Sequence, residues 1–174
     1  MRIDPSQYPS YFQRYIELVE GIDLHSLLPQ SFDELKVALL QIPVSKADYA
    51  YASGKWTVKQ VLQHCIDTER IFAYRALCIS RDEQQHLPGF DQDYYIQHAN
   101  LQNKSLEFLK EEMLIARQST LMLFQHFTDT ELSKKGIASE HPITVLALGY
   151  IIVAHWMHHQ RELTEKYGII FTRS

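Results

Sequence analysis

The sequence predicts an all-α fold, a four-helix bundle with a long crossover between the second and third helices. Apolar residues recur at three- and four-residue spacing along most of the 174 residues, without repeats or low-complexity tracts. Pro, Gly and capping sequences divide these periodic stretches into four long helices. We expect residues 1–174 to form one domain, since a chain of this size can bury roughly 70% of its unfolded surface.

The first helix of the bundle is expected in two parts. One part runs from about Ser10 to Val19. The second part begins at Ser31, because Ser31 is followed three residues later by Glu34, which is the pattern of a capping box. Pro29 and Pro43 bracket this second part.

A long link separates the second and third helices. The second helix is expected from Thr57, which forms another capping box with Gln60, to about Ser80. Residues 81–90 contain Pro88-Gly89 and break the pattern, and a polar stretch then leads into a third helix from about Asn103 to Phe127. A link of this length predicts a crossover rather than a tight hairpin.

The fourth helix, expected from about Thr144 to Lys166 with Gly168 as its left-handed stop, carries two histidines on one face. Residues four apart on a helix lie ~5–6 Å from each other, so His155 and His159 can chelate one ion. His64, among apolar residues of the second helix, would supply a third imidazole from a facing helix. Three protein ligands leave a position for water, which is the arrangement of a catalytic metal site.

Each histidine also has a structural interpretation. A lone His64 is interpreted as a core histidine bonded to a carbonyl, and His155 and His159 as residues flanking the bundle surface. The three together favour a metal, because burying three imidazoles without one leaves donors and acceptors unpaired, at ~1–3 kcal/mol each. A di-iron centre is disfavoured, since it requires Glu-x-x-His on two helices and this spacing occurs once, from Glu83 to His86, in the predicted link.

Three further residues are expected near the site. His158 lies about 100° around the helix from His159, so it is predicted to support the ligands from outside or to lie on the surface. Glu162 returns to the ligand face, where it is a candidate ligand, imidazole partner or catalytic base, or else a solvated residue. Asp67 follows one turn after the histidine of the second helix, and it either orients that ligand and moves protons or pairs with Arg70.

Composition and charge restrict the partners. The net charge is −4 and the Lys and Arg residues are scattered, so we expect no nucleic acid partner. The longest apolar stretch, Ile143–Ala154, is interrupted and too short to span a bilayer, so we expect no membrane partner and a cytoplasmic location. Cys65 and Cys78 lie nearly four turns apart on one helix, which excludes a disulfide between them and leaves imidazole as the metal ligand.

Three segments of the sequence are similar to the motifs of one known family. They are Gly54-Lys55-Trp56-Thr57-Val58 with the following Leu62-Gln63-His64-Cys65-Ile66-Asp67-Thr68-Glu69-Arg70, Leu87-Pro88-Gly89-Phe90-Asp91, and His155-Trp156-Met157-His158-His159. The sequence thereby resembles the DinB superfamily, of the DinB/YfiT type, from about Tyr49 to Tyr167. The resemblance implies a four-helix bundle, a metal held by His64, His155 and His159, and frequent homodimers.

The resemblance also implies an activity. Members of the family include metal-dependent hydrolases and thiol-dependent transferases, with bacillithiol transferases and mycothiol-dependent isomerases among the relatives. We therefore expect a metal-binding DinB-like protein that acts on a small-molecule substrate, as a hydrolase or, with a low-molecular-weight thiol, as an S-transferase. Two alternatives stay open: a non-catalytic metal-binding stress-response protein, and an all-α interaction module without a metal.

Three neutral imidazoles suit several divalent metals. Zn or Ni is expected, and Fe, Co and Cu are compatible with the same donors. Asp67 or Glu162 would move the proton when the metal activates a water or a thiol. No motif identifies the residues that would bind a thiol or the substrate.

Overall fold

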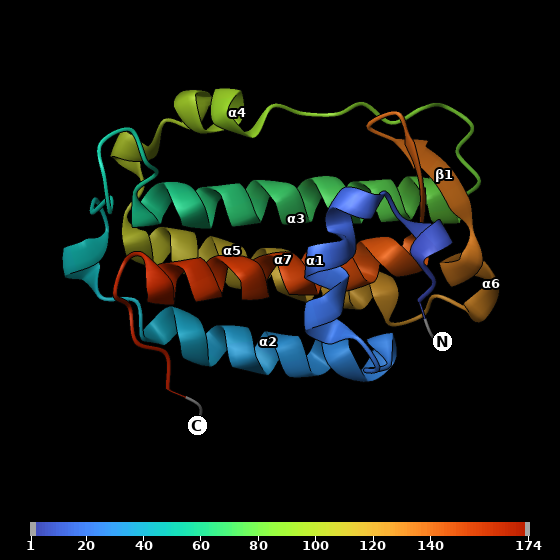
Figure 1. Cartoon of the computed structure of the whole chain (residues 1–174), viewed down its shortest axis with the longest axis horizontal. Coiled ribbons are helices and arrows are strands. Elements are labelled where there is room, and N and C mark those ends of the chain that lie inside the picture. Colours follow the sequence, from blue (N-terminus) through green and yellow to red (C-terminus); the bar gives the residue numbers. More distant parts are fainter. Residues whose placement is uncertain (1–2, 173–174) are drawn as a thin grey trace.

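The computed structural model describes residues 3–172 and shows a mostly helical chain, which confirms the predicted fold class. Four long helices, α2, α3, α5 and α7, lie side by side (Figure 1). The elements in chain order are η1 Pro5–Gln7, η2 Ser10–Phe12, α1 Gln13–Ile16, η3 Glu17–Val19, α2 Leu24–Leu40, η4 Val44–Lys46, α3 Val58–Ser80, α4 Gln92–His98, η5 Leu101–Asn103, α5 Leu106–Phe124, α6 Asp129–Ser133, β1 Lys135–Ala138, β2 His141–Thr144 and α7 Val145–Glu165, where η denotes a short 3-10 helix.

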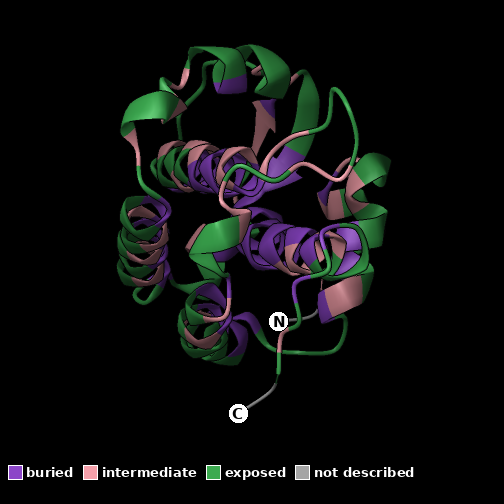
Figure 2. Ribbon diagram, turned by 90° about the vertical axis from the view of Figure 1, so that its left-hand side faces the viewer, coloured by how far each residue is buried: buried purple, intermediate pink, exposed green. Residues whose placement is uncertain are grey.

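The long helices enclose the core, as the buried residues in Figure 2 show. Helix α3 packs against α5 and α7, and α2 packs against the same two helices, so α2 and α3 lie at opposite corners of the bundle. The short helix α1 crosses the outer side of α7 (Figure 1), and residues Val145–Trp156 of α7 are therefore buried on every side. The histidine-bearing part of α7 consequently lies inside the molecule.

The start of α2 differs from the prediction. The helix begins at Leu24, where the Asp23 side chain accepts a hydrogen bond from the backbone N–H two residues further on, and the predicted start at Ser31 is wrong. Pro29 lies in the second turn, where its ring removes one backbone hydrogen bond. Burial of the leucines around it offsets this cost. Ser31 lies within the helix, and its hydroxyl donates to the carbonyl of Leu28 at 2.7 Å.

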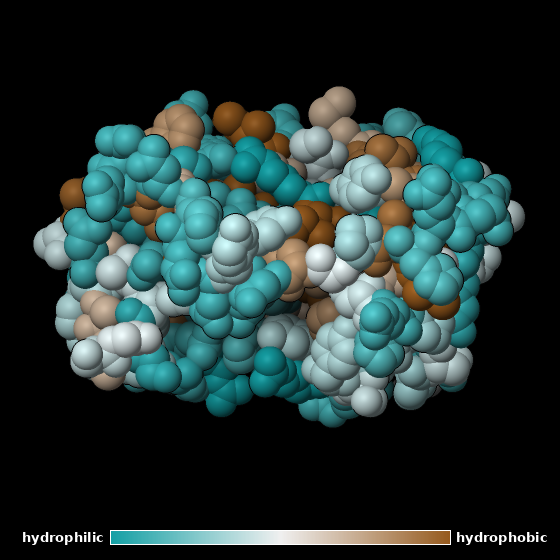
Figure 3. Space-filling model, turned by 90° about the horizontal axis from the view of Figure 1, so that it is seen from above, coloured by the Kyte–Doolittle hydropathy of each residue, from teal (hydrophilic) through white to brown (hydrophobic). Residues whose placement is uncertain are grey.

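The second helix and the crossover are confirmed, but the crossover holds structure that was not predicted. Thr57 and Gln60 form the predicted capping box at the start of α3. The crossover runs along the outer side of α3 (Figure 1) and contains the short helix α4, capped by the carboxylate of Asp91. Figure 3 shows this side from above: hydrophilic residues dominate it, and apolar atoms are exposed in its middle part.

A two-stranded antiparallel sheet, β1 and β2, was also not predicted. Ala138 pairs with His141, which leaves Ser139 and Glu140 as a two-residue loop. Both loop residues have positive φ, 50° and 66°, as a type I′ turn requires. The backbone of Leu87 in the crossover bonds to this hairpin, so the crossover and the hairpin are held together at one end of the bundle.

A buried ion pair lies in the centre of the bundle. The guanidinium of Arg117 on α5 donates from Nε to Glu69 on α3 at 2.8 Å, and the two side chains are 0% and 3% exposed. Nη1 of Arg117 donates to Ser31 on α2 at 3.0 Å, and Nη2 to the carbonyl of Ile152 on α7 at 3.4 Å. This network connects all four long helices.

Helix α7 has the predicted bounds and stop. It begins at Val145, where the Thr144 hydroxyl accepts the N–H of Ala147, and it ends at Glu165. Gly168 adopts the left-handed conformation, with φ 63°, that stops a helix. Within residues 3–172, none of the helices combines the length and the apolar character that a membrane span needs.

Candidate metal centre

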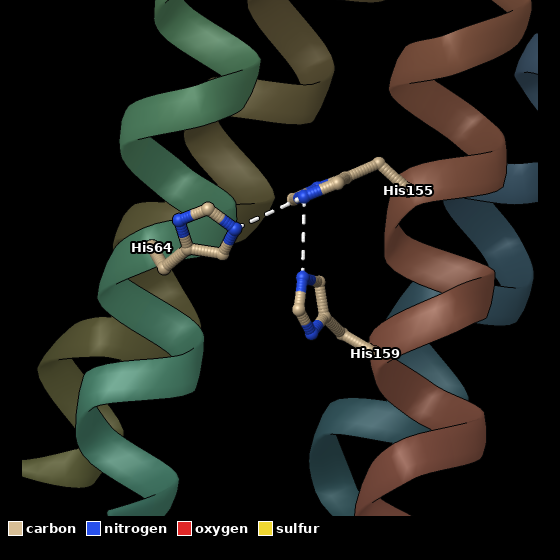
Figure 4. A group of neighbouring side chains, drawn as sticks. All are labelled: His64, His155 and His159. Atoms are coloured by element: carbon tan, nitrogen blue, oxygen red, sulfur yellow. Dashed lines mark hydrogen bonds between the residues drawn. The ribbon is translucent and has the colours of Figure 1, made fainter. Parts of the chain in front are cut away.

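Helices α3 and α7 bring His64, His155 and His159 together (Figure 4). Nε2 of His64 lies 3.0 Å from Nε2 of His155, and Nε2 of His159 lies 3.1 Å from the same atom. The three residues are buried, with 4%, 9% and 7% of their surface exposed. Because α3 and α7 are neighbours in the bundle, imidazoles 91 positions apart in the sequence meet at one point.

Nε2 of His155 faces two other ring nitrogens at once. An imidazole nitrogen has one position in the ring plane, and that position holds either a proton or a lone pair. Straight hydrogen bonds to both neighbours are therefore not available to this atom. One ion bound by all three nitrogens would satisfy them, because bonds of ~2.0–2.1 Å at angles of about 90–110° place ligand nitrogens roughly 2.8–3.4 Å apart. The donor set and its spacing thus fit a divalent metal ion.

Glu162 determines which nitrogen of His159 faces the cluster. Nδ1 of His159 has no aligned hydrogen-bond partner among residues 3–172, but Oε2 of Glu162 lies 2.9 Å away. Since a carboxylate only accepts, this contact favours a proton on Nδ1 and leaves a lone pair on Nε2. The contact with His159, assisted by Lys166, lowers the pKa of Glu162 to about 2, so its carboxylate is ionised. Metal-binding histidines typically have such a carboxylate behind them.

A hydroxyl lies behind Nδ1 of His64, as the carboxylate of Glu162 lies behind Nδ1 of His159. Oγ1 of Thr68 lies 3.5 Å from Nδ1 of His64, and the ring of Trp56 packs against the imidazole at 4.9 Å between centroids. Sequence reasoning did not select Thr68, although its spacing of four residues from His64 places it on the same helix face.

Burial keeps two of the imidazoles neutral. Desolvation, followed by the charge of His159, lowers the pKa of His64 to about 3. Desolvation also lowers the pKa of His155 well below its usual range, and His159 and His64 act in the same direction. The neutral form is the one that binds metals, so at neutral pH both side chains are in the form that a metal would require.

Without metal, the protein is expected to lose stability below about pH 6.5. His64 and His155 stay neutral in the folded state but take up protons in the unfolded chain, where the imidazole pKa is 6.5. The unfolded state then binds more protons, so the free energy of unfolding falls as the pH falls from about 6.5 towards 3, by up to ~1.4 kcal/mol per pH unit for each histidine. Urea unfolding of the metal-free protein across this pH range measures how the free energy of unfolding changes with pH. A stability independent of pH below 6.5 would contradict the burial of neutral imidazoles.

His158 and Glu162 lie beside the three histidines. His158 is half-buried, with Nε2 3.7 Å from Oε2 of Glu162 and its ring 5.1 Å from that of Tyr15. Together with His159 they form a second group whose potential ligand atoms lie within 4.8 Å of one another. The structure therefore brings His158 and Glu162 to the edge of the cluster.

Asp67 belongs to neither of these groups. Its carboxylate accepts a hydrogen bond from Nε2 of Gln63 at 2.8 Å, and burial raises its pKa. Arg70, the alternative partner expected for Asp67, forms its ion pair with Glu112 at 2.7 Å. The carboxylate that contacts a histidine of the cluster is thus Glu162.

Replacing Glu162 with Ala is expected to weaken metal binding about 10- to 100-fold, because His159 then loses the carboxylate that orients its ring. Competition with a chromophoric chelator measures the affinity. Glu165→Ala is the matched control, since Glu165 is exposed on the same helix and pairs with Arg161. Equal affinities in the two variants would remove Glu162 from the site.

The fold and the site define the class of protein: a helical bundle with a candidate metal centre between two of its helices. The sequence model of the DinB superfamily matches residues 27–163, so the chain belongs to this family, as its motifs predicted. The structure is similar to that of YfiT from Bacillus subtilis, described as a probable metal-dependent hydrolase with an unusual four-helix bundle topology. The TM-score is 0.68 at 18% identity, with 98% of this chain and 95% of YfiT covered, and it shows a shared fold. A search of curated proteins found no match.

Proposed function

We propose that this protein is a metal-dependent hydrolase that holds one divalent ion, Zn or Ni, on His64, His155 and His159. The observation that carries the proposal is the convergence of three buried ring nitrogens, with a carboxylate behind one of them. A divalent ion bound by histidines supplies a water with a pKa near ~7 and polarises a carbonyl. YfiT, which shares the fold, is described as a probable metal-dependent hydrolase, and this supports the same assignment.

The chain's own residues have separate tasks in this proposal. Glu162 keeps the proton of His159 on Nδ1, so that Nε2 faces the ion. We assign proton transfer to Glu162 rather than to Asp67, because Glu162 contacts a histidine of the cluster whereas Asp67 is bonded to Gln63. His158, 3.7 Å from Glu162, lies where it supports the position of that carboxylate.

The proposal is tested by elemental analysis of the purified wild type and of His159→Ala, followed by activity screens. We expect about one equivalent of metal in the wild type, with hydrolysis of activated esters that chelation abolishes and metal restores. In His159→Ala, metal content and activity should both fall at least ~10-fold, as expected when a ligand is lost. Equal metal content in the two proteins, or hydrolysis that survives chelation, would overturn the proposal.

The same preparations separate the remaining alternatives. A second screen offers the loaded protein an electrophile with several low-molecular-weight thiols, because a bound ion can also hold a thiolate. Thiol transfer without hydrolysis would assign the site to an S-transferase. A tightly held ion without either activity would indicate a non-catalytic metal-binding protein, and the absence of metal would leave an interaction module.

The predicted homodimer also stays a proposal. Phe108, Ile115 and Met122 recur at seven-residue spacing on α5 and are 51%, 59% and 68% exposed, which marks one apolar stripe that a second copy would cover. Light scattering of the wild type and of Ile115→Glu measures the oligomeric state. A cytoplasmic location and a small-molecule rather than a nucleic acid partner remain predictions from the composition.

A further inference from the structure

Arg75, on α3, is buried without a carboxylate partner. The residue is 5% exposed, and among residues 3–172 no acidic side chain forms an ion pair with it. Its Nη2 donates to the carbonyl of Pro88 at 2.7 Å and to the hydroxyl of Ser139 at 2.9 Å. Arginine is seldom fully buried unless an anion accompanies it. Within the described residues, the positive charge of Arg75 therefore lacks the anion that usually accompanies a buried arginine.

Part of the guanidinium of Arg75 has no hydrogen-bond partner among the described residues. Both of its hydrogen bonds use Nη2, so the N–H groups of Nη1 and Nε have no partner within residues 3–172. In this part of the chain, the side chains that hold a fully enclosed polar atom without a partner are Glu69, Trp156 and His159. Arg75 is not among them, so its free donors are not fully enclosed by the described part of the chain.

Tyr11 adds a second donor at the same place. The residue is 50% exposed, and within the described residues its hydroxyl has no hydrogen-bond partner. Burial raises the pKa of Tyr11 against the opposing positive charge of Arg75, so the phenol keeps its proton. The ring of Tyr11 lies 5.7 Å from that of His141, in the same hairpin as Ser139, which accepts a hydrogen bond from Arg75. One guanidinium and one neutral hydroxyl thus form a small donor site.

This donor site lies on the same helix face as the candidate metal centre. Within α3, His64, Thr68, Ile71 and Arg75 follow one another at spacings of four, three and four residues, which places them in one stripe. Eleven residues of α-helix separate the Cα atoms of His64 and Arg75 by about 16 Å. A molecule lying along this stripe would have one end at each site.

Aromatic rings connect the two sites along α1. The guanidinium of Arg75 lies 5.3 Å from the ring of Phe72, which packs against Phe12 at 5.9 Å. The ring of Phe12 lies 6.0 Å from that of Tyr15, which in turn lies 5.9 Å from His155. An unbroken row of rings therefore runs from the guanidinium to a candidate metal ligand. Phe72 and Tyr15 are buried in the core and Phe12 is partly exposed, so a ligand beside the row would meet it at Phe12.

We propose that Arg75 and Tyr11 bind the carboxylate of an elongated substrate whose apolar body lies along the aromatic row and whose reacting group faces His64, His155 and His159. The assignment of this ligand as a substrate rests on the proposed function, whereas its binding does not. The hydrogen bonds are charge-assisted, with the guanidinium N–H and the phenol O–H donating to the carboxylate oxygens.

The charge of the donor site favours a carboxylate over a phosphate group. Arg75 supplies one positive charge, and a carboxylate neutralises it with one negative charge. A phosphate monoester carries nearly two negative charges at neutral pH, so a second charge would be desolvated without a partner. The apolar row leading away from Arg75 suits the hydrocarbon or aryl body of an organic acid.

The test compares the binding of 4-phenylbutyrate with that of its neutral amide, 4-phenylbutanamide, by calorimetry. Both ligands are titrated into the wild type, Arg75→Gln and Arg81→Gln, each with and without bound metal. Arg81 is an exposed arginine directly after the end of α3 and pairs with Glu131, so it controls for the loss of a surface charge. We expect the acid to bind about 10- to 100-fold more tightly than the amide in the wild type and in Arg81→Gln, with or without metal.

In Arg75→Gln this preference for the acid should disappear while the affinity for the amide stays unchanged. If Arg75→Gln does not fold, Tyr11→Phe decides, since it removes one exposed hydroxyl and should reduce the affinity for the acid about 3- to 10-fold. The inference would be overturned if the wild type showed no preference for the acid, or if that preference required the metal. It would also be overturned if the preference survived at full strength in folded Arg75→Gln or in Tyr11→Phe. Failure of the proposed hydrolase would instead appear as missing metal or missing activity with the acid preference intact.

Discussion

Replacing His155 with Ala is expected to reduce the affinity for divalent metal by at least ~100-fold, the upper end of what losing a residue behind a ligand costs, because here a ligand itself is lost. Nε2 of His155 is the atom that both other ring nitrogens approach, at 3.0 and 3.1 Å, so its removal leaves two donors that no longer converge with a third. Because a metal on three converging ligands would bind the folded protein alone, the variant should also lose the stabilisation that saturating metal would give, ~2.7 kcal/mol at a concentration 100 times the dissociation constant. Thermal unfolding with and without added metal measures both effects.

His158→Ala is the matched control for this variant. His158 is also on α7 and half-buried. Its ring lies beside Tyr15 and the carboxylate of Glu162, however, and not at the place where the three ligand nitrogens meet. It should retain metal binding within about tenfold of the wild type. A metal-dependent shift of equal size in His155→Ala and in the wild type would refute the assignment of His155.

Breaking the buried ion pair is expected to cost the most stability. Arg117→Leu leaves the carboxylate of Glu69 charged, 3% exposed and without its partner, which typically costs about 3–5 kcal/mol. The double variant Glu69→Leu, Arg117→Leu removes both charges and should recover most of this loss, because an apolar pair of similar volume needs no compensation. Urea unfolding of the wild type, the single variant and the double variant gives the three free energies.

The ion pair also contacts α7, the helix that carries two residues of the candidate metal centre. Arg117 donates to the carbonyl of Ile152, one turn before His155. The single variant should therefore weaken metal binding as well as stability, and the double variant should show whether the position of α7 is recovered. If the single variant were as stable as the double variant, the unpaired buried carboxylate would not be the cause of the stability loss.

Several parts of the structure could be predicted because their signals are local. The four long helices follow from periodicity and capping, and Thr57, Gln60 and Gly168 act as predicted at the helix ends. The relation of His155 to His159 is set by helix geometry alone. Their meeting with His64 needed a further assumption, that the second and fourth helices are neighbours, and the packing of α3 against α7 supplies it.

The missed elements lack such local signals. The hairpin turns at Ser139 and Glu140, two residues with positive φ where Asn-Gly or Asp-Gly is the usual signal. Helix α2 continues through Pro29, because tertiary burial outweighs the lost hydrogen bond. In each case packing against distant parts of the chain decides the conformation, and a single sequence does not display that packing.

The pairing of the buried charges was equally invisible in the sequence. Glu69 and Arg117 lie 48 residues apart, each on the apolar stripe of its helix, and their pairing emerges when α3 and α5 pack together. Asp67 and Glu162 were equal candidates from spacing alone. The structure separates them, since the carboxylate of Glu162 lies 2.9 Å from a ring nitrogen of the cluster and Asp67 bonds to Gln63.

X-ray absorption spectroscopy at the metal edge of the purified protein measures which atoms surround the ion and at what distances, so it tests directly whether the three imidazoles bind one ion. We predict one ion per chain with three imidazole nitrogens at ~2.0–2.1 Å and oxygen from water completing the shell. An ion bound through sulfur, fewer than three imidazoles around it, or protein that takes up no divalent metal would contradict the assignment of His64, His155 and His159 as a metal site.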